Sequence, residues 1–403
     1  MSAFLIHKIK WKTPEGCFFL LLLLYLIVNM INTSETSGGG VLNQVISGLI
    51  IVFCTVRVLF RKNSVLPQGK SVYKILGLFL IYITTRFVVM LFVDYSTAMS
   101  SMRSLLTILF WGVCLLFCMN EFGRTDPLDI ERLSRILIVL SFIGFIYSIL
   151  ITRQYLQSID EIGAVNSAGS AYMLVPLILL FLKGRLKHLG YLLCLVVCAW
   201  SQKRQCVLGF ALVSVFVIVE MLKDYFRTFR YVGIIYLLLA LAMSTKIMNV
   251  VFSGIIERQE YLNENSEISD SGRSVLREFA LDGFNDAKTP KKIFGGGPGT
   301  GGRYVEQRLG IFVAPHCGFI EVLCDYGIIG FVIYMLFFLS LLKTSLRFPR
   351  GSIKRKLLLG IFLAWVMSNL VSHAGRIWTM YFCIAIGCIL FFDYPRENNP
   401  SIN

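Results

Sequence analysis

The chain has 403 residues, of which 56% are hydrophobic, with a mean hydropathy of +0.70 and a formal net charge of +15. This composition is too apolar for a soluble globular domain and predicts an integral membrane protein. A basic excess of this size would suggest nucleic-acid binding in a soluble protein, but the positions of the charges along this chain argue against that partner.

The hydropathy pattern predicts an all-α membrane protein, a single polytopic domain over residues 1–403 with about twelve transmembrane helices. The run Cys17–Ile31 follows three lysines, as in a signal peptide, but no small-residue cleavage site comes after it. We therefore interpret it as an uncleaved first span. The expected spans are centred near residues 24, 50, 83, 110, 143, 174, 195, 214, 241, 330, 364 and 385.

The distribution of basic residues predicts the orientation of these spans. With a cytoplasmic N-terminus, most of the 39 lysine and arginine residues fall in cytoplasmic segments such as Arg61–Lys74 and Lys343–Lys356. This is the positive-inside bias of membrane proteins, and it places both termini in the cytoplasm. The outer loops Asn32–Gly40 and Asp94–Met102 are short, whereas the outer segment Ser253–Pro315, between spans nine and ten, is long.

The long outer loop Ser253–Pro315 is where we expect the functional site, because a long loop is usually either functional or disordered. Within it, apolar residues at helical spacing predict an amphipathic helix over Arg273–Phe284, with Arg273 and Arg277 on one face. The glycine run Gly295–Gly302 lacks the Lys-Ser/Thr of a phosphate-binding loop. We interpret it as permissive backbone that folds over a site, with a flexible linker as an equal alternative.

The sequence predicts neither a metal site nor a cofactor. Eleven cysteines are scattered mostly through the spans without a histidine cluster, which favours packing as small hydrophobic residues. No Asp-x-Asp sequence occurs in the predicted outer segments, so we expect a metal-independent reaction.

Several short sequences in the second half of the chain resemble the O-antigen polymerase and ligase family. These are Ser271-Gly272-Arg273 before an apolar helix, Phe294-Gly295-Gly296-Gly297, and His316 opening a span that contains Asp325-Tyr326-Gly327-Ile328-Ile329-Gly330. Members of that family are polytopic bacterial glycosyltransferases that act on undecaprenyl-diphosphate-linked glycans. Together the matching sequences extend over roughly residues 160–335, and the first 150 residues match only as generic spans.

Two details strengthen the resemblance. Ligase members are similar in having a histidine, a small polar residue, nine further residues and Gly-x-x-Gly. Here His316, Gly327 and Gly330 match, while Cys317 stands where the family has Asn, Ser or Gln. Ser201-Gln202-Lys203-Arg204 resembles the family's outer-facing Ser-x-x-Arg, and Asn166 with Pro176 is a weaker third match.

The resemblance implies a catalytic set of His316, Arg204 and Arg273. Diphosphate is already a good leaving group, so transfer needs cations that stabilise its developing charge and a base for the acceptor hydroxyl. Arginine binds diphosphate oxygens bidentately, and neutral histidine is a suitable base near pH 7. The predicted substrate-binding residues are Arg277, Arg86, Lys203, Asn166 and Gly297.

Each of these residues also has a purely structural alternative. His316 could cap a helix, Arg204 could extend to the membrane interface, and Arg273 could simply solvate its helix. Arg86 lies well inside the third span, where a charge is costly and usually faces a cavity or a partner.

We expect a polymerase that joins undecaprenyl-diphosphate-linked repeat units at the periplasmic face of the bacterial inner membrane. The alternative is a ligase that transfers the same donor to lipid A–core, and a more distant one is a polysaccharide flippase or transporter. The expected partners are the lipid-linked donor and acceptor, membrane lipids and a chain-length regulator, without nucleic acid.

Overall fold

The computed structural model describes residues 14–31, 41–60, 69–121, 138–139, 142–143, 175–180, 182, 185–200, 204–225 and 273–371. Asn166, Lys203 and the expected spans near residues 241 and 385 lie outside these ranges, and of the span near 143 only four residues are described. All regular structure in the described ranges is helical, which agrees with the all-α prediction.

The helices occupy most of the expected span positions. They are α2 (Pro14–Ile31), α3 (Val41–Phe60), α4 (Lys70–Val93), α5 (Tyr95–Glu121), α7 (Val175–Leu179), α8 (Arg185–Trp200), α9 (Arg204–Tyr225), α15 (Gly318–Arg347) and α16 (Ile353–Val371). Between α9 and α15 lie three shorter helices: α12 (Arg273–Asp286), α13 (Thr289–Phe294) and α14 (Thr300–Leu309).

Among the described residues, two helices are long and apolar enough to cross a membrane, α4 and α15. Shorter apolar stretches occur at Gln44–Phe60, Leu105–Asn120 and Gly209–Val219, within α3, α5 and α9. These helices are consistent with the predicted all-α membrane protein, while the number of twelve spans stays a prediction.

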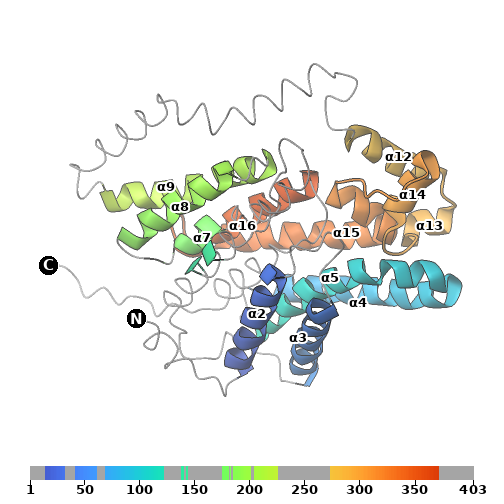
Figure 1. The fold of residues 1–403 in the computed structure, drawn as a ribbon, viewed down its shortest axis with the longest axis horizontal. Helices are drawn as coiled ribbons and strands as arrows, with labels where there is room; N and C mark the ends of the chain where they lie inside the picture. Colours follow the sequence, from blue (N-terminus) through green and yellow to red (C-terminus); the bar gives the residue numbers. More distant parts are fainter. Residues whose placement is uncertain are drawn as a thin grey trace.

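Helices α4, α5, α15 and α16 form the centre of the bundle (Figure 1). Helix α15 packs against both α4 and α16, α5 packs against α3 and α4, and α9 packs against α16. Large aromatic side chains fill the contact between α5, α15 and α16, where the ring of Trp365 lies 5.0 Å from Trp111, 5.1 Å from Phe337 and 4.9 Å from Phe338. These tilted and edge-on contacts are the favoured geometry of aromatic pairs.

The hairpin α15–α16 returns the chain to the end of the bundle at which α15 begins. The guanidinium Nη2 of Arg277 in α12 donates a hydrogen bond of 3.1 Å to the carbonyl of Leu370, near the end of α16. That carbonyl is one of the last four of its helix, which have no partner within the helix. Figure 1 shows α12, α13 and α14 grouped beside the ends of α4 and α15.

The prediction of a loop over Asp94–Met102 is wrong, because the chain is helical again from Tyr95 onward. Helix α4 ends at Val93 and α5 begins at Tyr95, so Asp94 alone separates them. Its carboxylate accepts a hydrogen bond from the Ser96 hydroxyl, and its carbonyl accepts one from the amide of Ala98. The polar residues that suggested a loop form the first turns of α5, where buried Ser101 meets Arg303 of α14.

Candidate functional site

The start of α15 holds His316 in an uncommon backbone conformation. Its φ is +52°, and it is the only non-glycine residue with positive φ in the part of the chain that the structure describes. Its side chain is half-buried. Such conformations persist only where the surrounding structure fixes them, and they gather at functional sites. His316 therefore lies just before the start of a bundle helix, as predicted, in a specific left-handed backbone turn.

Cys317 occupies the N-cap position of α15. Its extended φ and ψ of −143° and 108° are those of an N-cap residue, but no side chain bonds to the first turn there. Asn and Ser are favoured N-cap residues because their side chains accept a hydrogen bond from that turn. The buried cysteine cannot do this well, which gives a physical meaning to its departure from the family pattern.

Helix α15 is broken at Gly327, which has φ +66° and ψ −171°. The break leaves carbonyls of the preceding turn without helical partners, and the glycine run supplies new ones. The amide of Gly297 donates to the carbonyl of Asp325 at 2.9 Å, and the amide of Gly296 donates to that of Cys324 at 3.3 Å. The hydroxyl of Tyr82, in α4, donates to the carbonyl of Tyr326 at 3.0 Å.

The glycines at this crossing allow two main chains to touch. A Cβ at Gly327 would lie 2.5 Å from the carbonyl oxygen of Ile293 and would collide with the amide nitrogen of Gly295. A Cβ at Gly295 would collide with the Asp325 carbonyl in turn. The glycine run is therefore held against α15 by main-chain contacts and is not a flexible linker. Its predicted role in folding over a site stays a prediction.

The carboxylate of Asp325 holds the first turn of α14. It accepts hydrogen bonds from the amides of Gly299, at 2.9 Å, and Gly301, at 3.1 Å. These amides would otherwise lack helical partners, and a negative charge is favoured at a helix N-terminus. The signal in the sequence was a carboxylate within an apolar span, two residues before Gly-x-x-Gly.

Arg303 connects the same turn to α5. Its Nη2 donates to the hydroxyl of Thr300 at 2.6 Å, and its Nη1 donates to the hydroxyl of Ser101 at 3.4 Å. Burial lowers the pKa of the Arg303 guanidinium, while the nearby carboxylates of Asp325 and Asp94 act in the opposite direction. Nothing in the local sequence distinguishes Arg303 from the other basic residues of the loop, so its role could not be predicted.

Arg86 forms a hydrogen bond with the main chain of the glycine run. Its Nη2 donates to the carbonyl of Gly295 at 2.9 Å, and its guanidinium lies 5.8 Å from the centre of the Phe294 ring. The prediction that Arg86 faces a polar partner is confirmed, and that partner is main chain. Gly297 is buried against Met90 of α4. Substrate binding by Arg86 or Gly297 stays a prediction.

The two predicted arginines of α12 lie in different surroundings. The predicted helix is confirmed as Arg273–Asp286, and its buried residues Ala280 and Phe284 pack in one cluster with Tyr304. Arg277 is bonded to α16, whereas Arg273 is half-buried and bonded to no described residue. Arg204 is the first residue of α9, and α9 packs against α16, the helix that Arg277 reaches.

The structure therefore brings Arg86 and Gly297 together at the glycine run and places His316 and Arg273 on packed neighbouring elements. Gly301 of α14 faces Pro315, the residue before His316, with 3.3 Å between a Cβ built at Gly301 and the Pro315 ring. Helix α12 packs on α14 and α15.

Comparison with known proteins agrees with the region to which the motifs point. Residues 189–335 match the family model described as O-antigen ligase. The match includes Arg204, Arg273, His316 and Gly327. No curated protein matches the chain. The resemblance seen in the motifs is thus confirmed over residues 189–335, which are similar to the O-antigen ligase family, a membrane-associated family of glycosyltransferase-like enzymes.

Proposed function

We propose that the protein is a polymerase that joins undecaprenyl-diphosphate-linked repeat units at the periplasmic face of the inner membrane. The observation that carries the proposal is the left-handed backbone of His316 at the start of α15, inside the matched region. This turn presents a half-buried imidazole at the end of a bundle helix, where the proposed reaction brings together the donor sugar and a hydroxyl of the lipid-linked acceptor glycan.

In the proposed step, the acceptor hydroxyl oxygen forms a bond to the anomeric carbon of the donor sugar. The bond between that carbon and the diphosphate oxygen breaks, and its electron pair leaves with the undecaprenyl diphosphate. His316 accepts the hydroxyl proton. No metal or cofactor enters this step, since the leaving group needs only cationic stabilisation.

Arg273 and Arg204 are the proposed source of that stabilisation. Arg273 lies in the first turn of α12, and its guanidinium forms no hydrogen bond or ion pair with a described residue. Arg204 opens α9 in the manner of the family's Ser-x-x-Arg. Guanidinium groups stay charged and bind diphosphate oxygens in pairs, so lysine is expected to replace either arginine poorly.

The ligase alternative has specific support, because the matching family model bears that description. Both reactions use the same donor and differ in the acceptor. A flippase would move the lipid-linked unit without forming a glycosidic bond.

A transfer assay separates the three functions. Purified protein is given a labelled undecaprenyl-diphosphate-linked repeat unit, with and without lipid A–core, and the products are resolved by size. A ladder of longer lipid-linked glycans without added lipid A–core supports the polymerase. Label that appears only on lipid A–core supports the ligase, and an unchanged substrate that is moved across vesicles supports the flippase.

Variants of His316 test the proposed base, and the choice of replacement residue separates loss of the imidazole from strain in the left-handed backbone. Alanine removes the imidazole but also strains a left-handed position, whereas glycine and asparagine tolerate positive φ. Loss of a positioned base is expected to lower the transfer rate by ~10²-fold or more in the glycine, asparagine and glutamine variants alike. Normal transfer by the asparagine variant, with only alanine impaired, would leave His316 a purely structural role.

A further inference from the structure

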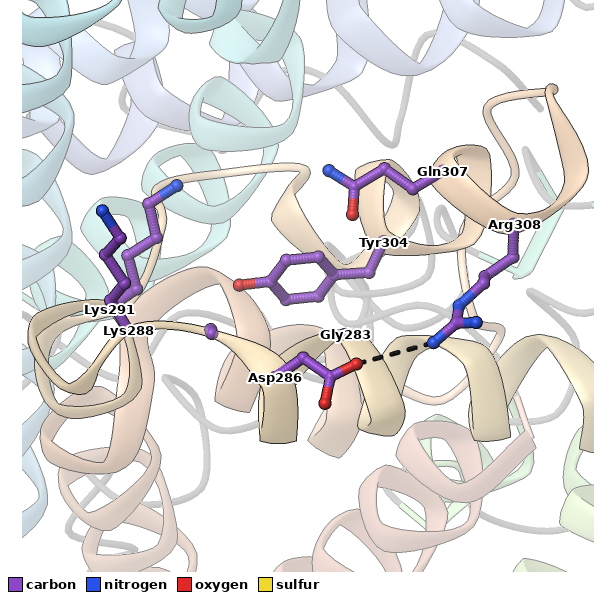
Figure 2. A pocket seen from close by; sticks show the side chains of 8 residues that line it. Gly283, Asp286, Lys288, Lys291, Tyr304, Gln307 and Arg308 are labelled. Carbon is purple, nitrogen blue, oxygen red and sulfur yellow. Dashed lines mark hydrogen bonds and ion pairs between the residues drawn. The ribbon is translucent and has the colours of Figure 1, made fainter.

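A cavity of about 350 Å³ lies between α12, α13 and α14, separate from His316 and Arg273. Figure 2 shows its lining side chains, which come from the end of α12, the connection to α13, α13 itself and one face of α14. They include Tyr304, Gln307, Lys288 and Lys291. This volume is at the lower end of the range for small-molecule sites, roughly 300–1,000 Å³.

Tyr304 lines the cavity, and its ring lies on the bare backbone of Gly283. A Cβ at Gly283 would collide with this ring, so the glycine makes room for it. Tyr304 is buried, and no described residue hydrogen-bonds its hydroxyl. Burial raises the pKa of Tyr304, which keeps the hydroxyl protonated and able to donate. In Figure 2 the hydroxyl points toward the side of the cavity where Lys288 and Lys291 lie.

The cavity also has an uneven distribution of charge. On one side Arg308 pairs with Asp286, with 3.5 Å between Nη2 and Oδ2, so these two charges offset each other. On the other side Lys288 and Lys291 are both exposed, and no described residue forms an ion pair with either ammonium group. The lining therefore presents two unmatched positive charges beside a tyrosine hydroxyl.

We propose that this cavity is a binding subsite for an acidic sugar unit of the glycan substrate. The proposal rests on the proposed function, which brings a glycan to this side of the protein. A sugar ring would occupy the cavity, its hydroxyls would meet the Tyr304 phenol and the Gln307 amide, and its anionic group would meet the two lysines. A cavity that offers a phenol hydroxyl and a side-chain amide beside the lysines suits a sugar better than a lipid surface does, since a lipid surface needs only projecting lysines.

The test is a binding titration on purified full-length protein in a neutral detergent, which needs no transfer activity. The probe is a short oligogalacturonate, an oligosaccharide of acidic sugars, and binding is followed by the broadening of its proton NMR signals. The wild-type protein is expected to bind it, with an affinity that falls as salt is added. A neutral maltooligosaccharide of the same length is expected to bind more weakly.

Three variants make the test specific. Lys288→Ala combined with Lys291→Ala is expected to weaken binding about tenfold, and Tyr304→Phe, which keeps the ring, about threefold. Lys292→Ala is the matched control, because Lys292 belongs to the same helix and does not line the cavity; its binding should be unchanged. Thermal unfolding of each variant shows whether the fold is intact.

Several results would overturn the proposal: equal binding of the neutral probe, unchanged binding by the double lysine variant, or equal loss in the Lys292 variant. Inorganic phosphate or anionic phospholipid that competes fully, without any effect of Tyr304→Phe, would also overturn it by showing a general anion surface. Failure of the transfer assay with retained, lysine-dependent probe binding would count against the proposed function and leave the subsite standing.

Discussion

The helical bundle and the α12–α14 region are held in place by different kinds of contact. In the bundle, fully buried side chains such as Phe337 and Leu341 of α15 pack against apolar neighbours. Around α14, position depends on main-chain groups: the amides of Gly297, Gly299 and Gly301 are all bound by oxygens of Asp325. Side-chain packing can adjust to small changes, whereas two touching main chains cannot.

This difference indicates how the chain can combine an apolar helical bundle with a loop region of fixed geometry. The break at Gly327 converts an apolar helix into an acceptor surface for the loop, and His316 is attached to the same helix a few turns earlier. The geometry of the site is therefore expected to fail when main-chain contacts are lost, even if the bundle remains folded.

The largest effect is expected for Gly327→Ala. The new Cβ would meet main-chain atoms of Ile293 and Gly295 and would sit at a strained φ of +66°. We expect a loss of about 3 kcal/mol or more in the stability of the α12–α14 region, and loss of glycan transfer. Hydrogen exchange of peptides from α13 and α14, compared with peptides from α4 and α5, measures this difference.

Gly310→Ala is the matched control for that experiment. Gly310 also has positive φ, +72°, but a Cβ there would have nothing within 4 Å. It therefore measures the backbone strain alone, about 1 kcal/mol. Equal effects of the two variants would show that the contact between main chains contributes nothing.

The next largest effect is expected for Asp325→Ala, which leaves two amides at the start of α14 without an acceptor. An unsatisfied buried amide costs about 1–3 kcal/mol, and since the bond to Gly299 is only part-buried, the region should lose about 2–4 kcal/mol in all. Asp325→Asn keeps the size of the side chain but turns an amide donor toward one of the glycine amides, so it should rescue little. Faster exchange confined to residues 297–303 supports this role, and uniform exchange throughout the protein contradicts it.

Much of the helical architecture could be predicted from the sequence, because apolar runs report burial in lipid or in the bundle wherever they occur. The helix over Arg273–Asp286 could be predicted for the same reason, since its apolar residues repeat at helical spacing. The site was harder to predict. The pairing of Asp325 with Gly299 joins residues 26 positions apart, and the contact of Tyr82 with Tyr326 joins residues 244 apart. Local sequence patterns contain no information about hydrogen bonds between residues so far apart in the chain.

The polar residues after Asp94 show a second reason why parts of the structure could not be predicted from the sequence. Serine and threonine in a short segment between two apolar runs are typical of a loop, yet here they form the first turns of α5 because Ser101 meets Arg303 of α14. A tertiary partner replaces the solvent that the sequence pattern implied. Arg86 is the opposite case, since a charge within a span predicted a polar partner and the structure shows one.

A smaller effect is expected for Arg86→Met, which keeps an unbranched chain of similar shape and removes the guanidinium. The Gly295 carbonyl would lose a charged donor at 2.9 Å and the Phe294 ring its cation contact, for a loss of about 1–2 kcal/mol. Thermal unfolding followed by a cysteine-reactive dye measures the loss. Arg57→Met, in α3, is the control for replacing an arginine within a bundle helix. If the loss were as large in the control, the contact with the glycine run would have no special role.

The smallest effect is expected in the bundle, at the hydrogen bonds that join α15 to α16. The indole nitrogen of Trp365 donates to the hydroxyl of Tyr334 at 3.2 Å, and that hydroxyl donates to the side-chain oxygen of Asn369 at 2.9 Å. Hydrogen bonds between membrane helices contribute only about 0.6 kcal/mol on average, because the separated helices find other partners.

Tyr334→Phe removes the hydroxyl and keeps the ring in its aromatic contacts with Phe338 and Trp365. We therefore expect a loss below about 1 kcal/mol, and unchanged exchange in α13 and α14. A loss as large as that of Asp325→Ala would show that polar contacts hold the bundle as they hold the loop, and the contrast between the two regions would not stand.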